Sequence, residues 1–535
     1  MNRRGTAFIA ITLLSIFPAR AFGQARDPLD GLDAYIRKAM IDWQVPGLAI
    51  TVVKNDSVLF LQSYGVREVG SDARVDENTI FEFGSTTKAF TATAIAMLVS
   101  DGKLSWDDPV SRYLPWLEFA DPFVTRHVTI RDLLSHRVAD GWGGSGYNFV
   151  LSDYPPREIL RRLAWRPPPG TAAAAGPTGA PSPLGSSPAG FRSRFQYENP
   201  NYYAAGEIIA AVTGVSAEEF IRSRILNPLG MKSAGTNAHD VWHARAIAPC
   251  IECGVGDHRV TLTDARVANV AALHRLGDRG PETTPMFAAP VGAGGIHGSI
   301  SDAARWLLFQ TGRGSIAGTR LLDARVFEQM HTPQVTVARE TQQDLHAGAG
   351  NLWAYGFGWY LTDYHGRMAS LHGGGFTSYI GLLRDDRVGV MVLANIPSAL
   401  REALVFRVFD AVVGAPPRDW SGEFLENRRK RAEQARLRRT APEPPPAPPR
   451  LPLAAYAGTF THPAFGDLFV THENGGLVLR FGGGQIGDLV SVGGHTFRVT
   501  WRGPERYRGI VRFTARTDRP EELTLQFPAA TFARK

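Results

Sequence analysis

Cysteine is scarce in this chain of 535 residues, which contains only Cys250 and Cys253. A short loop disulfide is the plainest interpretation of the pair in an oxidising compartment. A zinc site needs about four ligands, so it would have to recruit His258 or other residues. No βαβ pattern surrounds the two cysteines, which argues against a thioredoxin-like redox pair.

Long apolar runs are also lacking beyond the N-terminus. The chain begins with two nearby arginines, an apolar stretch from Ala7 to Phe17, and small residues at Gly23 and Ala25, where a signal peptidase would cut. We expect residues 1–25 to be a signal peptide and the protein to be exported, either periplasmic or secreted. The apolar stretch is too short to span a membrane and no later run is long enough, so we expect no membrane span.

The chain has no large excess of one charge. The formal net charge is +7, of which three charges come from arginines of the expected signal peptide, so the mature chain carries +4. Between Glu423 and Arg439, seven basic residues stand against three acidic ones, so the positive excess is local. This segment predicts a solvated charged helix, and we expect no nucleic-acid partner. With 44% hydrophobic residues, the chain is neither disordered nor fibrous and is long enough for two or more domains.

One stretch combines a polar pair with an apolar helix. The run from Ala89 to Ser100 is apolar or small on nearly every face, which predicts a helix buried all round that stops near Gly102. If the helix begins near Ser85, then Ser85 and Lys88 share a face of its first turn. The helix dipole stabilises the charge of an attacking serine oxygen, and desolvation favours a neutral lysine that can take its proton. An isolated S-x-x-K is, however, more often a serine N-cap beside a solvated lysine.

The segments around this helix predict an α+β fold. A helix over Leu29–Trp43 precedes a hairpin of two strands, Leu48–Lys54 and Ser57–Gln62. A helix and a hairpin before the apolar helix favour an antiparallel sheet flanked by helices over a βαβ repeat. A mostly helical stretch follows to about Leu163. The segment 167–194 is rich in Ala, Gly, Pro and Ser and has no periodic pattern of apolar residues, which predicts a surface loop.

Two later motifs carry polar groups that could act with the first. Tyr197-Glu198-Asn199 precedes a predicted helix over Asn201–Val212. The phenol of Tyr197 could relay a proton, and the amide of Asn199 could hold a substrate carbonyl. Alone, such a triplet is more often a packed tyrosine with a satisfied hydroxyl. His372-Gly373-Gly374-Gly375 follows a predicted short strand, Met368–Leu371, and an exposed N–H there could complete an oxyanion hole with that of Ser85. Alone, it is only a glycine-rich turn.

The remaining pattern completes the domain organisation. We expect a charged helix and proline-rich linker over 416–452, then an all-β domain over 453–535 with a turn at Asn474-Gly475. The other elements predicted are a helix over Ser301–Phe309, a strand over Tyr355–Tyr360, and a hairpin of Tyr379–Leu383 and Val388–Ala394.

Together the three motifs resemble those of the penicillin-recognising serine hydrolases, the group of class C β-lactamases, D-Ala-D-Ala carboxypeptidases, D-aminopeptidases and related esterases. Ser85-Thr86-Thr87-Lys88 matches S-x-x-K, Tyr197-Glu198-Asn199 matches Y-x-N, and His372-Gly373-Gly374 matches the H-x-G form of the third motif. The resemblance implies a β-lactamase-like serine hydrolase domain over 26–415. The stretch Tyr456–Asp467 resembles the start of the lipocalin-like barrel appended to some of these hydrolases.

The resemblance implies acyl transfer in two steps, without a metal or cofactor. Ser85 attacks an amide or ester carbonyl while Lys88 and Tyr197 share the general-base work, and the N–H groups of Ser85 and Gly375 hold the oxyanion. The expected substrates are small D-residue peptides or esters. A β-lactamase or D-Ala-D-Ala carboxypeptidase, and an acylated sensor with little turnover, are the alternatives; the oligomeric state stays open. The substrate-binding and oxyanion residues implied are Asn199, His372, Gly374 and Gly375.

Three features depart from the family pattern. His372 stands where β-lactamases have lysine, and Gly373 lacks the hydroxyl that they use on the antibiotic's carboxylate, which disfavours a β-lactamase. The sequence after Leu-Ser-His is Arg137-Val138-Ala139-Asp140-Gly141, where the family usually has Thr or Arg, Ser, Gly. The segment Thr171–Gly190 looks inserted beside Tyr197, where it either covers the site or projects away from it.

Overall fold

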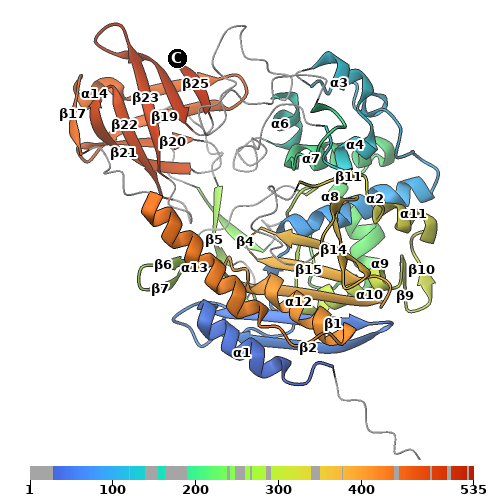
Figure 1. The fold of residues 1–535 in the computed structure, drawn as a ribbon. Coiled ribbons are helices and arrows are strands. Elements are labelled where there is room, and N and C mark those ends of the chain that lie inside the picture. Colours follow the sequence, from blue (N-terminus) through green and yellow to red (C-terminus); the bar gives the residue numbers. More distant parts are fainter. Residues whose placement is uncertain are drawn as a thin grey trace, which may run out of the picture.

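The computed structural model divides the chain into a larger α+β part and a smaller β part (Figure 1). The expected signal peptide, both cysteines and most of the segment 167–194 lie outside the residues that the structure describes, so what the sequence predicts for them stays a prediction. The described residues are 28–119, 121–138, 155–162, 190–237, 241–246, 260–265, 268–284, 291–338, 350–375, 377–438, 445–481, 485–502, 508–526 and 529–535.

An eight-stranded antiparallel sheet forms the centre of the larger part, in the order β11-β12-β13-β14-β15-β16-β1-β2. The N-terminal hairpin joins the last strand of this part, with Ile50 opposite Val392. This arrangement confirms the predicted α+β fold. The strands are β1 (Gly47–Lys54), β2 (Ser57–Gly65), β11 (Val335–Thr336), β12 (Trp353–Tyr355), β13 (Tyr360–Tyr364), β14 (Arg367–Gly374), β15 (Ser378–Leu383) and β16 (Val388–Ala394).

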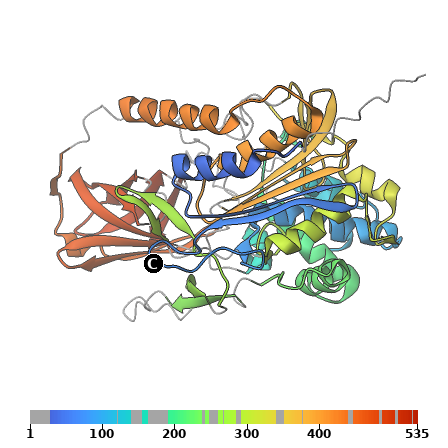
Figure 2. The same cartoon turned by 90° about the horizontal axis from the view of Figure 1, so that it is seen from below.

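Helices cover both faces of this sheet, as Figure 2 shows. On β16, Val390 and Val392 pack into one core and Met391 and Leu393 into the other, because successive strand side chains point to opposite faces. The first core includes α1 (Leu32–Trp43) and α12 (Leu400–Val413), with the start of α13 (Trp420–Arg438). The second includes α2 (Thr87–Ser100), α10 (Ile300–Thr311) and α11 (Ala324–Met330).

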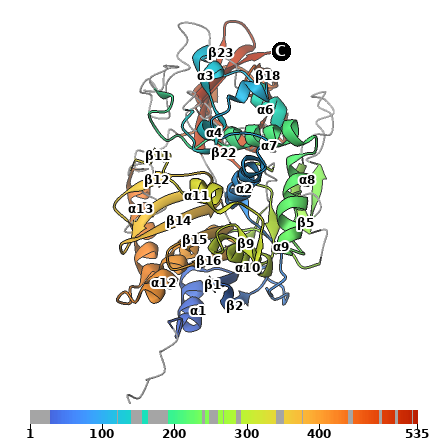
Figure 3. The ribbon, with the colours of Figure 1, turned by 90° about the vertical axis from the view of Figure 1, so that its right-hand side faces the viewer.

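A second group of helices lies on the far side of α2, so that α2 is enclosed between them and the sheet (Figure 3). Every residue of α2 from Thr87 to Leu98 is buried, which agrees with the predicted buried helix, whereas Ser100 at its end is exposed. The group contains α3 (Pro122–His127), α4 (Ile130–Leu134), α6 (Pro156–Arg162), α7 (Asn199–Thr213), α8 (Ala217–Ile221), the π-helical turn η4 (Arg222–Leu226) and α9 (Asn227–Leu229). Short pairs join β3 (Phe81–Glu82) to β8 (His297–Gly298), β4 (Trp242–Ala246) to β5 (Val260–Ala265), β6 (His274–Gly277) to β7 (Gly280–Thr283), and β9 (Ser315–Ile316) to β10 (Thr319–Arg320).

The C-terminal part is a closed eight-stranded antiparallel barrel, because the pairing of β21 with β22 joins the two ends of its sheet. Apolar side chains fill its interior, among them Phe460, Phe497 and Phe532. This architecture fits the predicted lipocalin-like domain. Its elements are β17 (Ala447–Pro449), α14 (Leu453–Tyr456), β18 (Gly458–His462), β19 (Gly466–Glu473), β20 (Gly476–Phe481), β21 (Gln485–Gly494), β22 (Thr496–Trp501), β23 (Arg508–Ala515), β24 (Pro520–Gln526) and β25 (Ala529–Arg534).

The turn between β18 and β19 joins the barrel to the larger part. Arg162 at the end of α6 donates a hydrogen bond from Nη1 to the carbonyl oxygen of Pro463 over 2.8 Å. Two residues later, the ring of Phe465 packs against the core that contains α2 and also against the core of the barrel. The two parts therefore share an apolar contact. In the described ranges, no helix combines the length and the apolar character needed to cross a membrane.

The structure corrects the sequence-based strands in two places. The predicted strand over Tyr355–Tyr360 is wrong: β12 ends at Tyr355, β13 begins at Tyr360, and a turn joins them. Gly358 in this turn has φ +79°, and an added Cβ would lie 2.8 Å from the carbonyl oxygen of Lys88. The second correction concerns β14, which extends to Gly374, so that His372, Gly373 and Gly374 belong to the strand instead of following it.

Candidate active site

Ser85 and Lys88 lie at the start of the buried helix α2. Ser85 belongs to a short 3₁₀ turn, η1 (Gly84–Thr86), that leads directly into α2, and it is partly exposed. Lys88 has no exposed surface, and its Nζ lies 3.1 Å from Oγ of Ser85. The backbone N–H groups at this helix end have no partners within the helix and favour negative charge nearby. The structure therefore places an accessible hydroxyl next to a desolvated amine.

The other contacts of Lys88 hold its amine in a fixed position. Its Nζ donates to Oδ1 of Asn199 over 2.8 Å and to the carbonyl oxygen of Ala293 over 2.9 Å. Both of these oxygens only accept, so when the amine is neutral it can donate its two protons to them and use its lone pair to accept from the hydroxyl of Ser85. Burial lowers the pKa of Lys88 well below its usual value. The pKa of Lys88 is thus shifted in the direction that a base requires, and its amine lies within hydrogen-bond distance of the hydroxyl.

Tyr197 lies on the other side of the same amine. The centroid of its ring is 4.7 Å from Nζ of Lys88, and the ring of Tyr202 is 5.6 Å away. The structure thus brings Ser85, Tyr197 and Asn199 together around the amine of Lys88. Part of this convergence comes from α7, which begins at Asn199 and packs against α2.

His136 is a residue of the site that sequence reasoning missed. Its ring lies 4.5 Å from that of Tyr197 and 5.0 Å from that of Tyr355, and its Nδ1 accepts the backbone N–H of Glu198 over 3.1 Å. Burial lowers the pKa of His136 well below its usual value, which favours the neutral ring. The only signal in the sequence was its place in Leu134-Ser135-His136, the segment before the atypical turn.

His372 is fixed as a neutral ring with a defined tautomer. Nδ1 lies 2.8 Å from the carbonyl oxygen of Gly373, which only accepts, so Nδ1 carries the proton and Nε2 accepts from the hydroxyl of Tyr355 over 3.0 Å. Burial lowers the pKa of His372 to about 3. This position therefore lacks the positive charge that a lysine would bring. Both ring nitrogens are engaged, and no three His, Cys, Asp or Glu side chains in the described ranges form a group able to hold a metal ion.

The glycines of the third motif let β14 approach the turn that carries Ser85. A Cβ on Gly374 would lie 2.0 Å from the carbonyl oxygen of Phe83, and one on Gly84, which has φ +52°, would lie 2.7 Å from the carbonyl oxygen of Gly374. Gly375 is exposed, and its carbonyl oxygen accepts from both terminal nitrogens of the buried Arg401 over 3.3 Å. The backbone of Gly375 is thus anchored close to the Ser85 turn.

Two family models match the chain. Residues 32–413 match the family described as Beta-lactamase, and residues 442–535 match a domain of unknown function, DUF3471. The first match covers the described residues of the candidate site, and the second covers the barrel.

Individual relatives agree with this assignment. An unguisins hydrolase of Aspergillus violaceofuscus is 28% identical over 481 residues, covering 82% of this chain and 76% of its own. Penicillin-binding protein 4 of Amycolatopsis lactamdurans is 26% identical over 361 residues, covering 66% of this chain and 81% of its own. In fold, the chain is similar to an octameric penicillin-binding protein homologue from Pyrococcus abyssi, with a TM-score of 0.55, 21% identity, and 94% and 99% of the two chains covered. Since the Beta-lactamase model spans most of the chain, the protein belongs to this family of penicillin-recognising serine hydrolases.

Proposed function

We propose that this protein is an exported hydrolase that cleaves amide or ester bonds through an acyl-enzyme on Ser85, with small D-residue peptides or esters as its substrates. The observation that carries the proposal is the buried amine of Lys88, 3.1 Å from Oγ of Ser85, with Asn199 and Ala293 accepting its other hydrogen bonds. A neutral amine in this position can remove the proton of Ser85 as its oxygen attacks.

The reaction proceeds in two steps. Oγ of Ser85 bonds to the carbonyl carbon, its proton passes to Lys88, and the N–H groups of Ser85 and Gly375 stabilise the oxyanion. Tyr197, beside the amine, relays the proton to the leaving group as the amide or ester bond breaks. Water then attacks the acyl-enzyme, with Lys88 and Tyr197 acting as its base, and the freed Ser85 regains a proton.

The neutral state of His372 supports substrates without a carboxylate beside the bond that is cleaved. A β-lactam places its carboxylate near the third motif, where His372 offers no positive charge because its pKa is about 3. The relative named an unguisins hydrolase supports a hydrolase. A β-lactamase or D-Ala-D-Ala carboxypeptidase is the second candidate, because the named relatives include a penicillin-binding protein.

A panel of p-nitrophenyl esters, D- and L-amino acid anilides and a chromogenic cephalosporin tests the proposal. We expect sustained turnover of esters or D-anilides, weak turnover of the cephalosporin, and a loss of about 10³-fold or more in Ser85→Ala. Ser57→Ala, at an exposed strand position, is the matched control and should keep full activity. Ser85→Ala should melt within about 2 °C of the native protein, since it removes one partly exposed oxygen.

Other outcomes would contradict the proposal in different ways. Release of one equivalent of product per protein, with no further turnover, would indicate an acylated sensor with little turnover. A preference for the cephalosporin would indicate a β-lactamase. Normal activity in a folded Ser85→Ala protein would refute the assignment of the nucleophile.

A further inference from the structure

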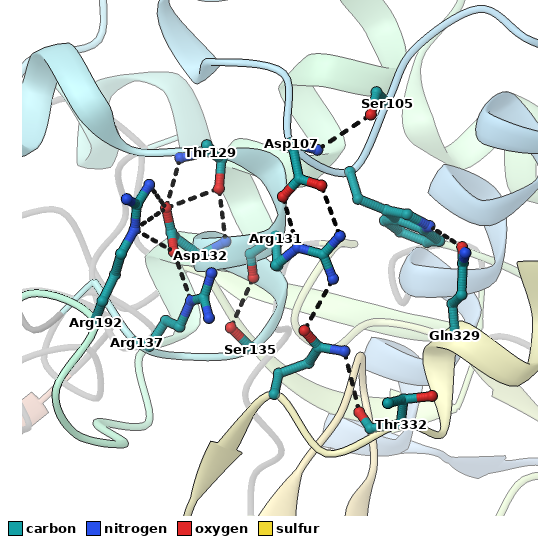
Figure 4. Close-up of polar contacts among 12 residues, drawn as sticks. Ser105, Asp107, Thr129, Arg131, Asp132, Ser135, Arg137, Arg192, Gln329 and Thr332 are labelled. Carbon is teal, nitrogen blue, oxygen red and sulfur yellow. Dashed lines mark hydrogen bonds and ion pairs between the residues drawn. The ribbon is translucent and has the colours of Figure 1, made fainter.

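A buried carboxylate outside the reacting groups joins two segments that flank the site. Asp132 on α4 has no exposed side-chain surface and lies between Arg137 and Arg192 (Figure 4). Nε of Arg137 donates to its Oδ1 over 2.6 Å, and Nη2 of Arg192 donates to its Oδ2 over 2.8 Å. Arg192 stands sixty positions later in the chain, so one carboxylate fixes the ends of two distant segments.

Asp132 is also anchored to its own helix. It forms a capping box with Thr129: the Thr129 backbone N–H donates to Oδ2 over 2.9 Å and the Thr129 hydroxyl over 2.7 Å. Burial by itself would raise the pKa of Asp132, but the hydrogen bonds from Arg192 and Thr129 and the charge of Arg137 lower it overall. The carboxylate is thus an ionised group on a rigid support, holding two cations.

The backbone continues this connection toward the active site. The N–H of Arg192 donates to the carbonyl oxygen of Arg137 over 2.8 Å, and the N–H of Gln196 donates to the carbonyl oxygen of His136 over 2.8 Å. The N–H of Glu198 then donates to Nδ1 of His136 over 3.1 Å. These contacts join the segment after α4 to the one before α7.

Tyr197 lies between the last two of these contacts. Its neighbours Gln196 and Glu198 are both bonded to His136, and its ring lies 4.5 Å from the His136 ring on one side and 4.7 Å from Nζ of Lys88. Any shift of the His136 turn would therefore move the phenol relative to the amine.

We propose that Asp132 is a positioning residue that holds the His136 turn and, through it, places the phenol of Tyr197 against Lys88. The inference rests on the proposed function, because it assigns to Tyr197 a part in the reaction. Arg137 and Arg192 are the two contacts through which Asp132 acts. A displacement of about 1 Å at a reacting group can reduce the rate about a hundredfold, so this support has a measurable kinetic effect.

A double-mutant cycle on the full chain, with Asp132→Asn and Tyr197→Phe, tests the inference. Asp132→Asn keeps the size of the side chain but removes the charge that pairs both arginines. We expect it to lower kcat about tenfold or more, with KM changed less than about threefold, in the native background. In the Tyr197→Phe background the same substitution should lower kcat less than about twofold, because the group that it positions no longer transfers a proton.

The outcomes separate this inference from the proposed function. If Tyr197→Phe lowers kcat but Asp132→Asn costs the same factor in both backgrounds, Asp132 has only a structural role and the inference is overturned. If Tyr197→Phe keeps native kcat, the assigned role of Tyr197 fails and the positioning role fails with it, while Ser85→Ala still tests the nucleophile.

A second variant guards against a misfolded protein. Arg192 is 44% exposed, so Arg192→Gln weakens the same contact with less damage to the core, and it should show the same dependence on Tyr197. Arg37→Gln removes an exposed ion pair with Asp33 on α1 and should leave kcat unchanged in both backgrounds. Equal losses from Arg192→Gln in the two backgrounds would overturn the inference.

Discussion

Burial lowers the pKa of both Lys88 and His372, but only Lys88 faces the nucleophile. The amine of Lys88 lies 3.1 Å from Oγ of Ser85. The ring nitrogens of His372 are both engaged, with the hydroxyl of Tyr355 and the carbonyl oxygen of Gly373. Desolvation therefore favours Lys88 as a proton acceptor, whereas it makes His372 an uncharged residue that lines the site.

This difference predicts the origin of the acid limb in the pH profile of kcat/KM. Activity needs neutral Lys88, so it should be present above the lowered pKa of that amine and fall as the pH drops through it. His372, with a pKa of about 3, is already neutral above pH 4. We expect His372→Asn to reduce kcat/KM but to shift the midpoint of the limb by less than about half a pH unit. Stopped assays from pH 4 to pH 9 measure this profile. If the acid limb disappears in His372→Asn, the limb belongs to His372 instead of Lys88.

Single residues also mark what the sequence could predict. Ser85 and Lys88 were predictable because their spacing on one helix turn is a local property. The contacts of Lys88 with Asn199 and Ala293 join positions 111 and 205 apart, which no local pattern specifies. His136 was missed for the same reason, since its importance comes from the rings packed around it.

At the scale of elements, the close approach of η1 to the end of β14 brings Ser85 near the third motif. This contact needs glycine on both sides: Gly84 has φ +52° and its added Cβ would meet the carbonyl oxygen of Gly374 at 2.7 Å. The neighbouring backbone cannot retreat without moving β14 out of the sheet. Glycine is needed at Gly84 and Gly374 because a side chain at either position would separate the backbones of η1 and β14.

We predict that Gly84→Ala damages stability and activity together. The substitution adds both left-handed strain and a clash, so it should lower the free energy of unfolding by about 3 kcal/mol and reduce kcat, as measured by denaturant unfolding and ester hydrolysis. Gly70→Ala is the control: Gly70 has φ +86° but nothing within 4 Å of the added Cβ, so it should lose only about 1 kcal/mol. Equal effects of the two substitutions would show that the contact with β14 is not restrictive.

Elements were predicted well where local signals define them. The hairpin of Tyr379–Leu383 and Val388–Ala394 and the helix α10 follow from alternation, turn residues and helical spacing, and the structure has both. The predicted strand over Tyr355–Tyr360 was wrong because Gly358 takes a positive φ to pack against α2, a distant partner. The extension of β14 to Gly374 was missed because glycines carry no β propensity and the strand is held by its neighbour β15.

At the scale of the whole molecule, the barrel and the hydrolase part meet through the turn after β18. Phe465 packs against both cores, and Arg162 of α6 donates to the neighbouring carbonyl of Pro463. Since α6 packs against α7, which begins at Asn199, the barrel is connected to the active-site helices by direct packing.

We predict that Phe465→Ala weakens this connection. Loss of the ring removes apolar contacts on both sides, so the free energy of unfolding should fall by about 1–3 kcal/mol, and limited proteolysis should cut the chain faster between 416 and 452. Val490→Ala, at a position of the barrel that is 38% exposed, should change neither result. Unchanged proteolysis in Phe465→Ala would indicate that other contacts hold the two parts together.

The sequence by itself determined the chemical groups of this protein and the elements that carry them. Spacing placed Ser85 and Lys88 on one turn of a buried helix, and alternation specified most strands, because both depend on interactions between near neighbours. Only the tertiary structure decided which distant groups surround the amine and that His136 and Asp132 support Tyr197. The physical reason is that burial and long-range contact, which set pKa values and orient side chains, arise only when separate segments pack together.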